Sequence, residues 1–174
     1  LDNGENRAKI VGAGAIPPLV ELVTDGTAGE KEVAASALAH LAVDKSDVKV
    51  AIAERGAIPP LVNLLKFGTN AAKAAAAGAL ASLSSNTTDH GADSVRAQIW
   101  KAGAIQPLID NLVTTPSLSL RLCWPSIIAT RVKAAEALGH LASHNDRHIK
   151  TEIALRGASG PLVCLLNGDE ASKS

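Results

Sequence analysis

Three histidines are the residues whose spacing comes nearest to a chemical site. His140, His144 and His148 follow one another at intervals of four, and two histidines four positions apart on one helix face can bind zinc. The helix that carries them is expected to end near Ser143, however, and residues 145–146 read as a turn, so His148 would point elsewhere. No cysteine pair or carboxylate completes a set of four ligands. We therefore predict no metal site and no cofactor.

Two glycine-containing stretches and one cysteine are the other candidates for chemistry. Residues 12–14 read Gly-Ala-Gly, but no strand precedes them, as a dinucleotide-binding loop would require. Residues 157–160 read Gly-Ala-Ser-Gly, one residue short of a nucleophile elbow and again without a strand. Cys123 would be reactive only if it were exposed beside Arg121, and a passive thiol is the simpler interpretation. Since no nucleophile, base and orienting group form a set, the sequence predicts a protein without enzymatic activity.

The composition favours close helix packing and argues against several classes of partner. Of 174 residues, 47% are hydrophobic but only 2% are aromatic, so the core must consist of Ala, Leu, Ile and Val. The 17 basic and 17 acidic residues cancel, which leaves no cationic surface for nucleic acid. No apolar run is long enough to span a membrane. Cys123 and Cys164 do not form a disulfide framework, so we expect a cytoplasmic or nuclear location.

The strongest pattern in the sequence is a phrase that recurs four times. Residues 14–20 and 56–62 both read Gly-Ala-Ile-Pro-Pro-Leu-Val, residues 103–109 read Gly-Ala-Ile-Gln-Pro-Leu-Ile, and residues 157–163 are a degenerate fourth copy. The first glycines of these copies are 42, 47 and 54 residues apart. Repetition at this period indicates an array of helical units. Because one such unit cannot bury enough apolar surface alone, the units must fold as a stack.

Each unit reads as three helices. The first is short and ends just before the glycine, which can adopt a left-handed conformation; we expect it at residues 6–12, 48–54, 95–101 and 149–155. The second begins at the proline pair, where a missing N–H costs nothing. The third opens in the first unit with a Thr27-x-x-Glu30 capping box. Its spacing of three and four predicts a core-facing stripe of Val33, Ala34, Ala37, Leu38 and Leu41.

A second phrase, Ala-Leu-x-x-Leu-Ala or a close variant, falls in the third helix at residues 37–42, 79–84 and 137–142. Together the two phrases closely resemble the armadillo repeat family over essentially the whole chain. The resemblance implies an all-α, right-handed superhelical solenoid of about 3.7 three-helix repeats, whose third helices line a concave groove for an extended partner segment. One domain, 1–174, would hold repeats at about 1–43, 44–86, 94–144 and 147–168.

The last of these repeats is truncated, and the lack of any methionine suggests a piece of a longer protein. We expect an exposed apolar stripe at residues 162–166 that would promote end-to-end self-association.

Two irregularities interrupt the repeat. Five extra residues fall in a polar stretch, 84–93, that reads as a tolerated surface loop. Eleven extra residues fall within 116–130, between the second and third helices of the third unit. This insertion is either a partner-binding protrusion with Trp124 as its anchor or a segment that folds back over its own apolar residues.

The residues predicted to line the groove help to distinguish which class of armadillo protein the sequence resembles. In members that bind nuclear-import signals, the third helix carries a Trp and, four residues later, an Asn. The corresponding pairs here are Ser36 with His40, Gly78 with Ser82, and Glu136 with His140. The predicted groove lining is Ser36, His40, Asp44, Gly78, Ser82, Asn86, Glu136, His140 and His144. These side chains either hydrogen-bond an extended backbone or are simply solvated.

The sequence thus predicts a non-catalytic protein–protein interaction scaffold that binds a protein or peptide segment in this groove. One alternative is a structural, self-associating module. Another, disfavoured by the missing Trp and Asn, is a nuclear-import-type adaptor. A basic residue also recurs at one position of each first helix, which predicts an outer ridge of cations lying over apolar neighbours: Arg7, Lys49, Arg96 and Lys150.

Overall fold

A computed structural model of the chain describes residues 3–43, 46–85, 90–113, 124–143, 147–158 and 160. Within these ranges the secondary structure consists of ten α-helices and no strand. They are α1 (Asn3–Gly12), α2 (Ile16–Asp25), α3 (Ala28–Leu41), α4 (Ser46–Glu54), α5 (Ile58–Phe67), α6 (Asn70–Ser84), α7 (His90–Lys101), α8 (Ile105–Val113), α9 (Trp124–Ser143) and α10 (Arg147–Leu155). No helix in the described ranges is long and apolar enough to cross a membrane.

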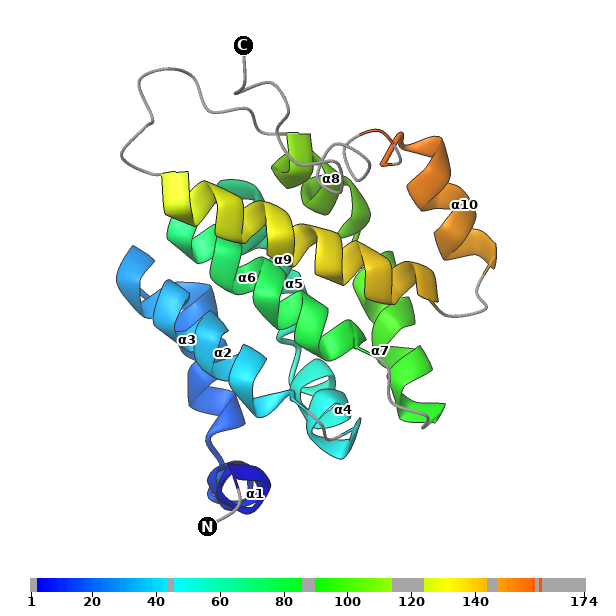
Figure 1. Cartoon of the computed structure of the whole chain (residues 1–174). Helices are drawn as coiled ribbons and strands as arrows, with labels where there is room; N and C mark the ends of the chain where they lie inside the picture. The colour runs from blue at the N-terminus through cyan, green and yellow to red at the C-terminus, as the bar shows by residue number, and fades with distance from the viewer. Residues whose placement is uncertain are drawn as a thin grey trace.

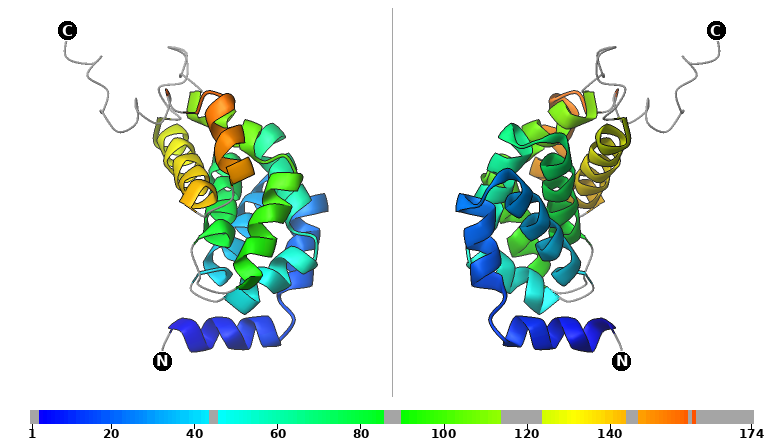
Figure 2. Two further views of the ribbon diagram at one scale, coloured as in Figure 1. Left: turned by 90° about the vertical axis from the view of Figure 1, so that its right-hand side faces the viewer. Right: turned by 90° about the vertical axis from the view of Figure 1, so that its left-hand side faces the viewer.

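The helices stack as repeating groups of three. The third helices α3, α6 and α9 lie side by side in one layer, with α6 in the middle (Figure 1). The second helices α2, α5 and α8 form a parallel row, in which α5 contacts both α2 and α8. Helix α1 lies across one end of the molecule, beyond this stack (Figure 2). The arrangement confirms the predicted all-α solenoid.

The four first helices end in the same way. Gly14, Gly56, Gly103 and Gly157 have φ angles between 73° and 82°. The N–H of each glycine bonds to the carbonyl three residues earlier at 2.9–3.1 Å, and the following N–H bonds to the carbonyl five residues earlier at 3.3 Å. This pair of bonds is a Schellman motif, which a residue with a Cβ would strain. The glycines therefore set the turn from the first helix into the second, as predicted.

The third helices begin at threonine caps, except in the third unit. Thr27 accepts a hydrogen bond from the Glu30 N–H at 3.4 Å, and the Glu30 carboxylate accepts one from the Thr27 N–H at 2.7 Å, which confirms the capping box. Thr69 caps α6 by accepting from the Ala72 N–H at 3.2 Å. The equivalent position before α9 is Ile127, whose side chain cannot cap a helix.

Helix α9 instead begins one turn earlier, at Trp124, and has 20 residues where α3 has 14 and α6 has 15. Residues 124–130, the described part of the range in which the eleven extra residues were predicted, are therefore helical. The Thr130 hydroxyl donates to the carbonyl of Asn70 at 3.1 Å, which ties the N-terminal part of α9 to the start of α6. The rest of the predicted insertion, 116–123, and the side chain of Trp124 lie outside the described residues.

The core is built from Ala, Leu, Ile and Val, as the composition predicts. Ala34, Leu38 and Leu41 of the predicted stripe are buried and Ala37 is half-buried, but Val33 is 69% exposed. The prediction for Val33 is wrong, since the side chain is exposed, and its counterparts in the next two units, Ala75 and Lys133, line a groove between the third helices.

The first helices begin earlier than predicted, although their C-terminal ends agree. Helix α7 starts at His90, so residues 90–93 are helical, and the expectation of a loop through 84–93 is wrong for them and for Ser84, the last residue of α6. The glycine signal marks the end of each first helix, whereas the sequence offers no comparable signal for its start.

Candidate functional site: the third-helix groove

The three parallel third helices α3, α6 and α9 enclose a groove of about 480 Å³. Its floor comes from α6 and its walls from α3 and the N-terminal half of α9. The lining residues are Glu32, Ser36, Ala39, His40, Val43, Ala71, Ala74, Ala75, Gly78, Ser82, Ala129 and Lys133.

The groove exists because α6 carries only small side chains on one face. Ala71, Ala74, Ala75, Gly78 and Ser82 recur at intervals of three and four and so share that face. None of these side chains is larger than a hydroxymethyl group. The flanking helices therefore stand higher than α6, and the middle of the layer is hollow.

One charged side chain lies on each wall of the groove. Glu32 comes from α3 and Lys133 from α9. The stem of Lys133 passes over Gly78, since a Cβ added to Gly78 would lie 3.7 Å from the lysine Cδ. The Lys133 ammonium pairs with the Glu136 carboxylate at 2.8 Å, and both side chains are nearly half exposed. Such a pair is too weak to fix the lysine, which can turn toward a ligand.

The structure brings four of the nine predicted groove residues together. Ser36, His40, Gly78 and Ser82 all line the groove, and His40 is exposed. Glu136 does not line the groove but forms the ion pair with Lys133, which does. Asp44, Asn86 and His144 lie outside the described residues.

His140 occupies a different setting from His40. It is half-buried, and its Nδ1 lies 3.0 Å from the carbonyl oxygen of Ala81. Because a carbonyl can only accept, Nδ1 carries a proton and donates. His140 therefore ties α9 to α6. Sequence reasoning missed Lys133 and the alanines of the floor, although the spacing of Ala71, Ala74 and Gly78 already places them on one face.

The predicted outer ridge of cations is wrong for two of its four members. Lys49 is fully buried, and its ammonium donates to the Ser85 hydroxyl at 2.6 Å and to the Ser85 carbonyl at 3.1 Å. Arg96 is 2% exposed and donates from Nη1 to the Ser84 carbonyl at 3.1 Å. Both cations thus satisfy carbonyls at the C-terminal end of α6, where the helix dipole favours positive charge. Arg7 is half-buried and Lys150 is exposed.

A polar cluster joins α10 to the third unit. The Trp100 indole N–H donates to the Glu152 carboxylate. Arg156 pairs with Glu152 at 2.6 Å and donates to the Gln106 side chain at 3.0 Å. The hydrogen bond from Trp100, and after it the contacts with Arg156, hold the pKa of Glu152 below its ordinary value. This cluster is an inter-unit contact and contains no nucleophile.

Among the described residues, no three His, Cys, Asp or Glu side chains could hold a metal ion together. As predicted, α9 ends at Ser143, and α10 begins at Arg147, so His140 and His148 belong to different helices.

Sequence and structure comparisons agree with this architecture. The Armadillo/beta-catenin-like repeat family matches residues 4–43 and 45–85. An engineered protein of known structure is 29% identical, with a TM-score of 0.81 over 98% of this chain and 63% of its own. A second engineered protein is 28% identical, with a TM-score of 0.80 over 97% and 61%. A designed armadillo repeat protein in complex with the peptide (KR)4 is 26% identical, with a TM-score of 0.79 over 96% and 63%.

This chain thus spans about three fifths of the length of these similar structures. No curated protein sequence matches it. The stacked three-helix units define an all-α armadillo solenoid, and the first two units match the Armadillo/beta-catenin-like repeat family.

Proposed function

We propose that the protein is a non-catalytic scaffold that binds an extended segment of a partner protein in the groove between α3, α6 and α9. The observation that carries this proposal is the small-residue face of α6, which leaves a hollow where a backbone fits between the flanking helices. The similar designed armadillo protein that is in complex with (KR)4 supports it. Its fold is shared by this chain, and its ligand is a peptide.

The charges of the groove favour a neutral or mixed-charge segment. Glu32 and Lys133 lie on opposite walls, so a ligand with one basic and one acidic side chain would find a partner on each side. Ser36, Ser82 and His40 offer hydroxyl and imidazole groups that hydrogen-bond a peptide backbone.

A pair of glycine variants tests this proposal. Random twelve-residue peptides would be selected against the protein, and the binders would be measured against Gly78→Leu and Gly139→Leu. Gly78→Leu fills the groove, because only the flexible Lys133 side chain lies near the new Cβ. Gly139 is also helical, but it is exposed, does not line the groove, and has nothing within 4 Å of an added Cβ.

We expect Gly78→Leu to weaken the selected peptides at least tenfold and Gly139→Leu to leave their affinity unchanged. The proposal fails if no peptide is selected, or if the binders are indifferent to Gly78→Leu.

The import-type adaptor is the first alternative, and the peptide (KR)4 tests it. The groove lacks the Trp and Asn pairs, and Lys133 would repel a wholly basic ligand. We expect (KR)4 to bind more weakly than the selected peptides. Tight binding with a steep loss of affinity as salt rises would favour the adaptor instead.

The self-associating module is the second alternative, and the exposed apolar residues of the first unit favour it. Ile10, Leu22 and Val33 are 47%, 39% and 69% exposed. The apolar stripe predicted at 162–166 lies outside the described residues. Sedimentation over a wide concentration range separates the two functions, because a scaffold keeps one mass while a self-associating module grows.

We also propose that the partners are proteins and that the protein works in the cytoplasm or nucleus. The cancelling charges disfavour nucleic acid, and two cysteines among 174 residues suit a reducing compartment. A gel-shift assay with duplex DNA and RNA tests the first point, and imaging of the tagged protein in cells tests the second.

A further inference from the structure

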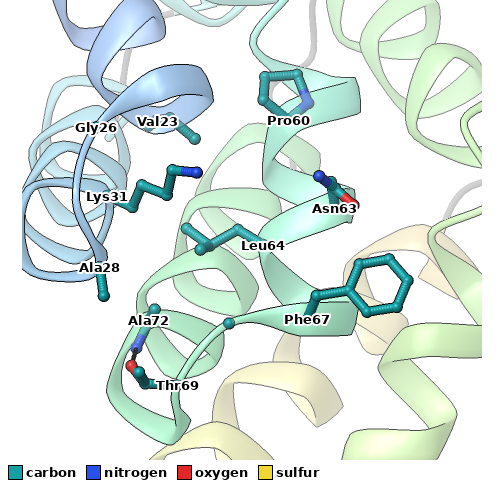
Figure 3. Close-up of a pocket in the computed structure, with 11 residues that line it drawn as sticks. Val23, Gly26, Ala28, Lys31, Pro60, Asn63, Leu64, Phe67, Thr69 and Ala72 are labelled. Atoms are coloured by element: carbon teal, nitrogen blue, oxygen red, sulfur yellow. Dashed lines mark hydrogen bonds between the residues drawn. The ribbon is translucent and has the colours of Figure 1, made fainter.

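Two pockets lie along the row of second helices, and Phe67 lines both. The first notch, of about 250 Å³, lies between α2–α3 and α5–α6 and includes Lys31, Pro60 and Leu64 (Figure 3). The second notch, of about 400 Å³, lies between α5–α6 and α8 and includes Lys73 and Pro107. Neither notch shares a residue with the third-helix groove.

The two notches are the same feature repeated. Lys31 and Lys73 occupy one position of successive units, and so do Pro60 and Pro107. In Figure 3 the Lys31 side chain reaches from α3 toward α5, where Asn63 and Leu64 lie. The first notch is smaller than small-molecule sites, which have about 300–1,000 Å³, and the second is in the lower part of that range, so each has room for a side chain.

Phe67 places an exposed aromatic ring on the surface between the two notches. It is the only phenylalanine in the sequence and is 81% exposed, although its neighbours Leu64 and Leu65 are buried. Its ring lies between two proline-bearing notches. An exposed aromatic side chain beside shallow notches resembles the aromatic-lined grooves in which polyproline II segments dock.

The charge of the notches is positive in a chain of zero net charge. Lys31 is the charged residue of the first notch, and Lys66 and Lys73 outweigh Asp110 in the second. Asp110 accepts a hydrogen bond from Gln106 at 2.8 Å. Within the described ranges, none of the three lysines forms an ion pair. The acidic residues of α2, Glu21 and Asp25, do not line the first notch.

The spacing of the notches fits one kind of segment. Packed helices are about 8–10 Å apart, and one turn of polyproline II helix takes three residues and about 9 Å. Residues three apart in such a segment point the same way, so one enters each notch. We propose that the surface formed by the two notches and Phe67, which is separate from the third-helix groove, docks an acidic polyproline II segment. This segment places apolar side chains at every third position and carboxylates beside the lysines.

The test uses the synthetic peptide (Leu-Asp-Pro)4, labelled for fluorescence anisotropy, and the whole chain. Two matched peptides serve as controls: (Leu-Lys-Pro)4 reverses the charge, and (Leu-Asp-Pro-Ser)4 changes the spacing while it keeps four carboxylates and four leucines. Phe67→Ala removes the aromatic side chain, and Leu155→Ala is its control, because Leu155 is also 81% exposed but lies on α10. The double variant Lys31→Gln, Lys73→Gln removes the repeated charge.

We expect (Leu-Asp-Pro)4 to bind at least tenfold more tightly than either matched peptide. Phe67→Ala and the double lysine variant should each weaken it at least fivefold, while Leu155→Ala and the groove variant Gly78→Leu should leave it unchanged. Absence of binding, equal binding of the three peptides, or an equal effect of Leu155→Ala would overturn the proposal. Loss of binding in Gly78→Leu would assign the peptide to the groove and overturn it as well.

Discussion

Lys49 of α4 and Arg96 of α7 bind neighbouring carbonyls, those of Ser85 and Ser84, at the C-terminal end of α6. The two cations come from successive units and occupy the same position of their first helices. Both are buried, so their role differs from that of the exposed Lys150, which holds the same position in α10. One repeat position thus holds a buried cation at a helix end in two successive units and an exposed cation in the next.

We expect Lys49→Met to lower the free energy of unfolding by about 1–3 kcal/mol, because the half-buried Ser85 carbonyl loses its donor while the apolar stem is kept. Lys150→Met is the matched control, and as an exposed change it should stay within about 0.5 kcal/mol. Urea denaturation of the two variants measures the difference. An equal loss of unfolding free energy in the two variants would contradict a capping role for Lys49.

The left-handed glycines yield a second prediction. Gly56→Ala should destabilise the protein by about 1–2 kcal/mol, since φ is 76° and nothing else crowds an added Cβ. Gly139→Ala should stabilise it by up to about 1 kcal/mol, because alanine is the better helix former and the site is open. Thermal unfolding should therefore shift in opposite directions for the two substitutions. A shift in the same direction would mean that the turn at Gly56 does not need glycine.

Trp100 should control the pKa of Glu152. Its hydrogen bond is the largest cause that holds this pKa below the ordinary glutamate value of 4.5. We expect Trp100→Phe to raise the pKa of Glu152 in an NMR titration, and Arg156→Gln to raise it less. Because the folded pKa is lowered, the stabilisation is present above pH 4.5 and is lost as the pH falls through the folded value. The stability difference between wild type and Trp100→Phe should accordingly narrow in acid, and a constant difference would refute the linkage.

The capping box predicts how much the free energy of unfolding falls when one hydroxyl is removed. Thr27→Ala should destabilise the protein by about 1 kcal/mol, because the Glu30 N–H loses its acceptor. Thr24 is also exposed, but its hydroxyl donates to the Val20 carbonyl inside α2, so Thr24→Ala should cost less than about 0.5 kcal/mol. Chemical denaturation of both variants would decide the point, and equal effects would rule against the cap.

The repeat, the helix ends and the caps were predictable because each depends on residues close together in the sequence. The glycine at C′, the proline pair and the Thr27–Glu30 box act within one turn. The positions of Lys49 and Lys133 were not predictable in this way. Lys49 is buried by a helix end 36 residues away, and Lys133 reaches the groove because α9 lies along α6. Val33 was misplaced because helical spacing identifies a face but not what covers it.

Because Lys49 and Arg96 both bind the C-terminal end of α6, this helix end bears on where the chain could be divided into fragments. The sequence phrases place a boundary between the second and third units near residues 86–89. A fragment that stopped there would keep Lys49 but lose Arg96, and with it the hydrogen bond that Arg96 donates to the Ser84 carbonyl. A fragment of the second unit that keeps both Lys49 and Arg96 must extend through α7 to the turn at Gly103. We therefore expect the smallest autonomously folding pieces of this solenoid to overlap by one helix, so that their boundaries differ from the boundaries of the sequence repeat.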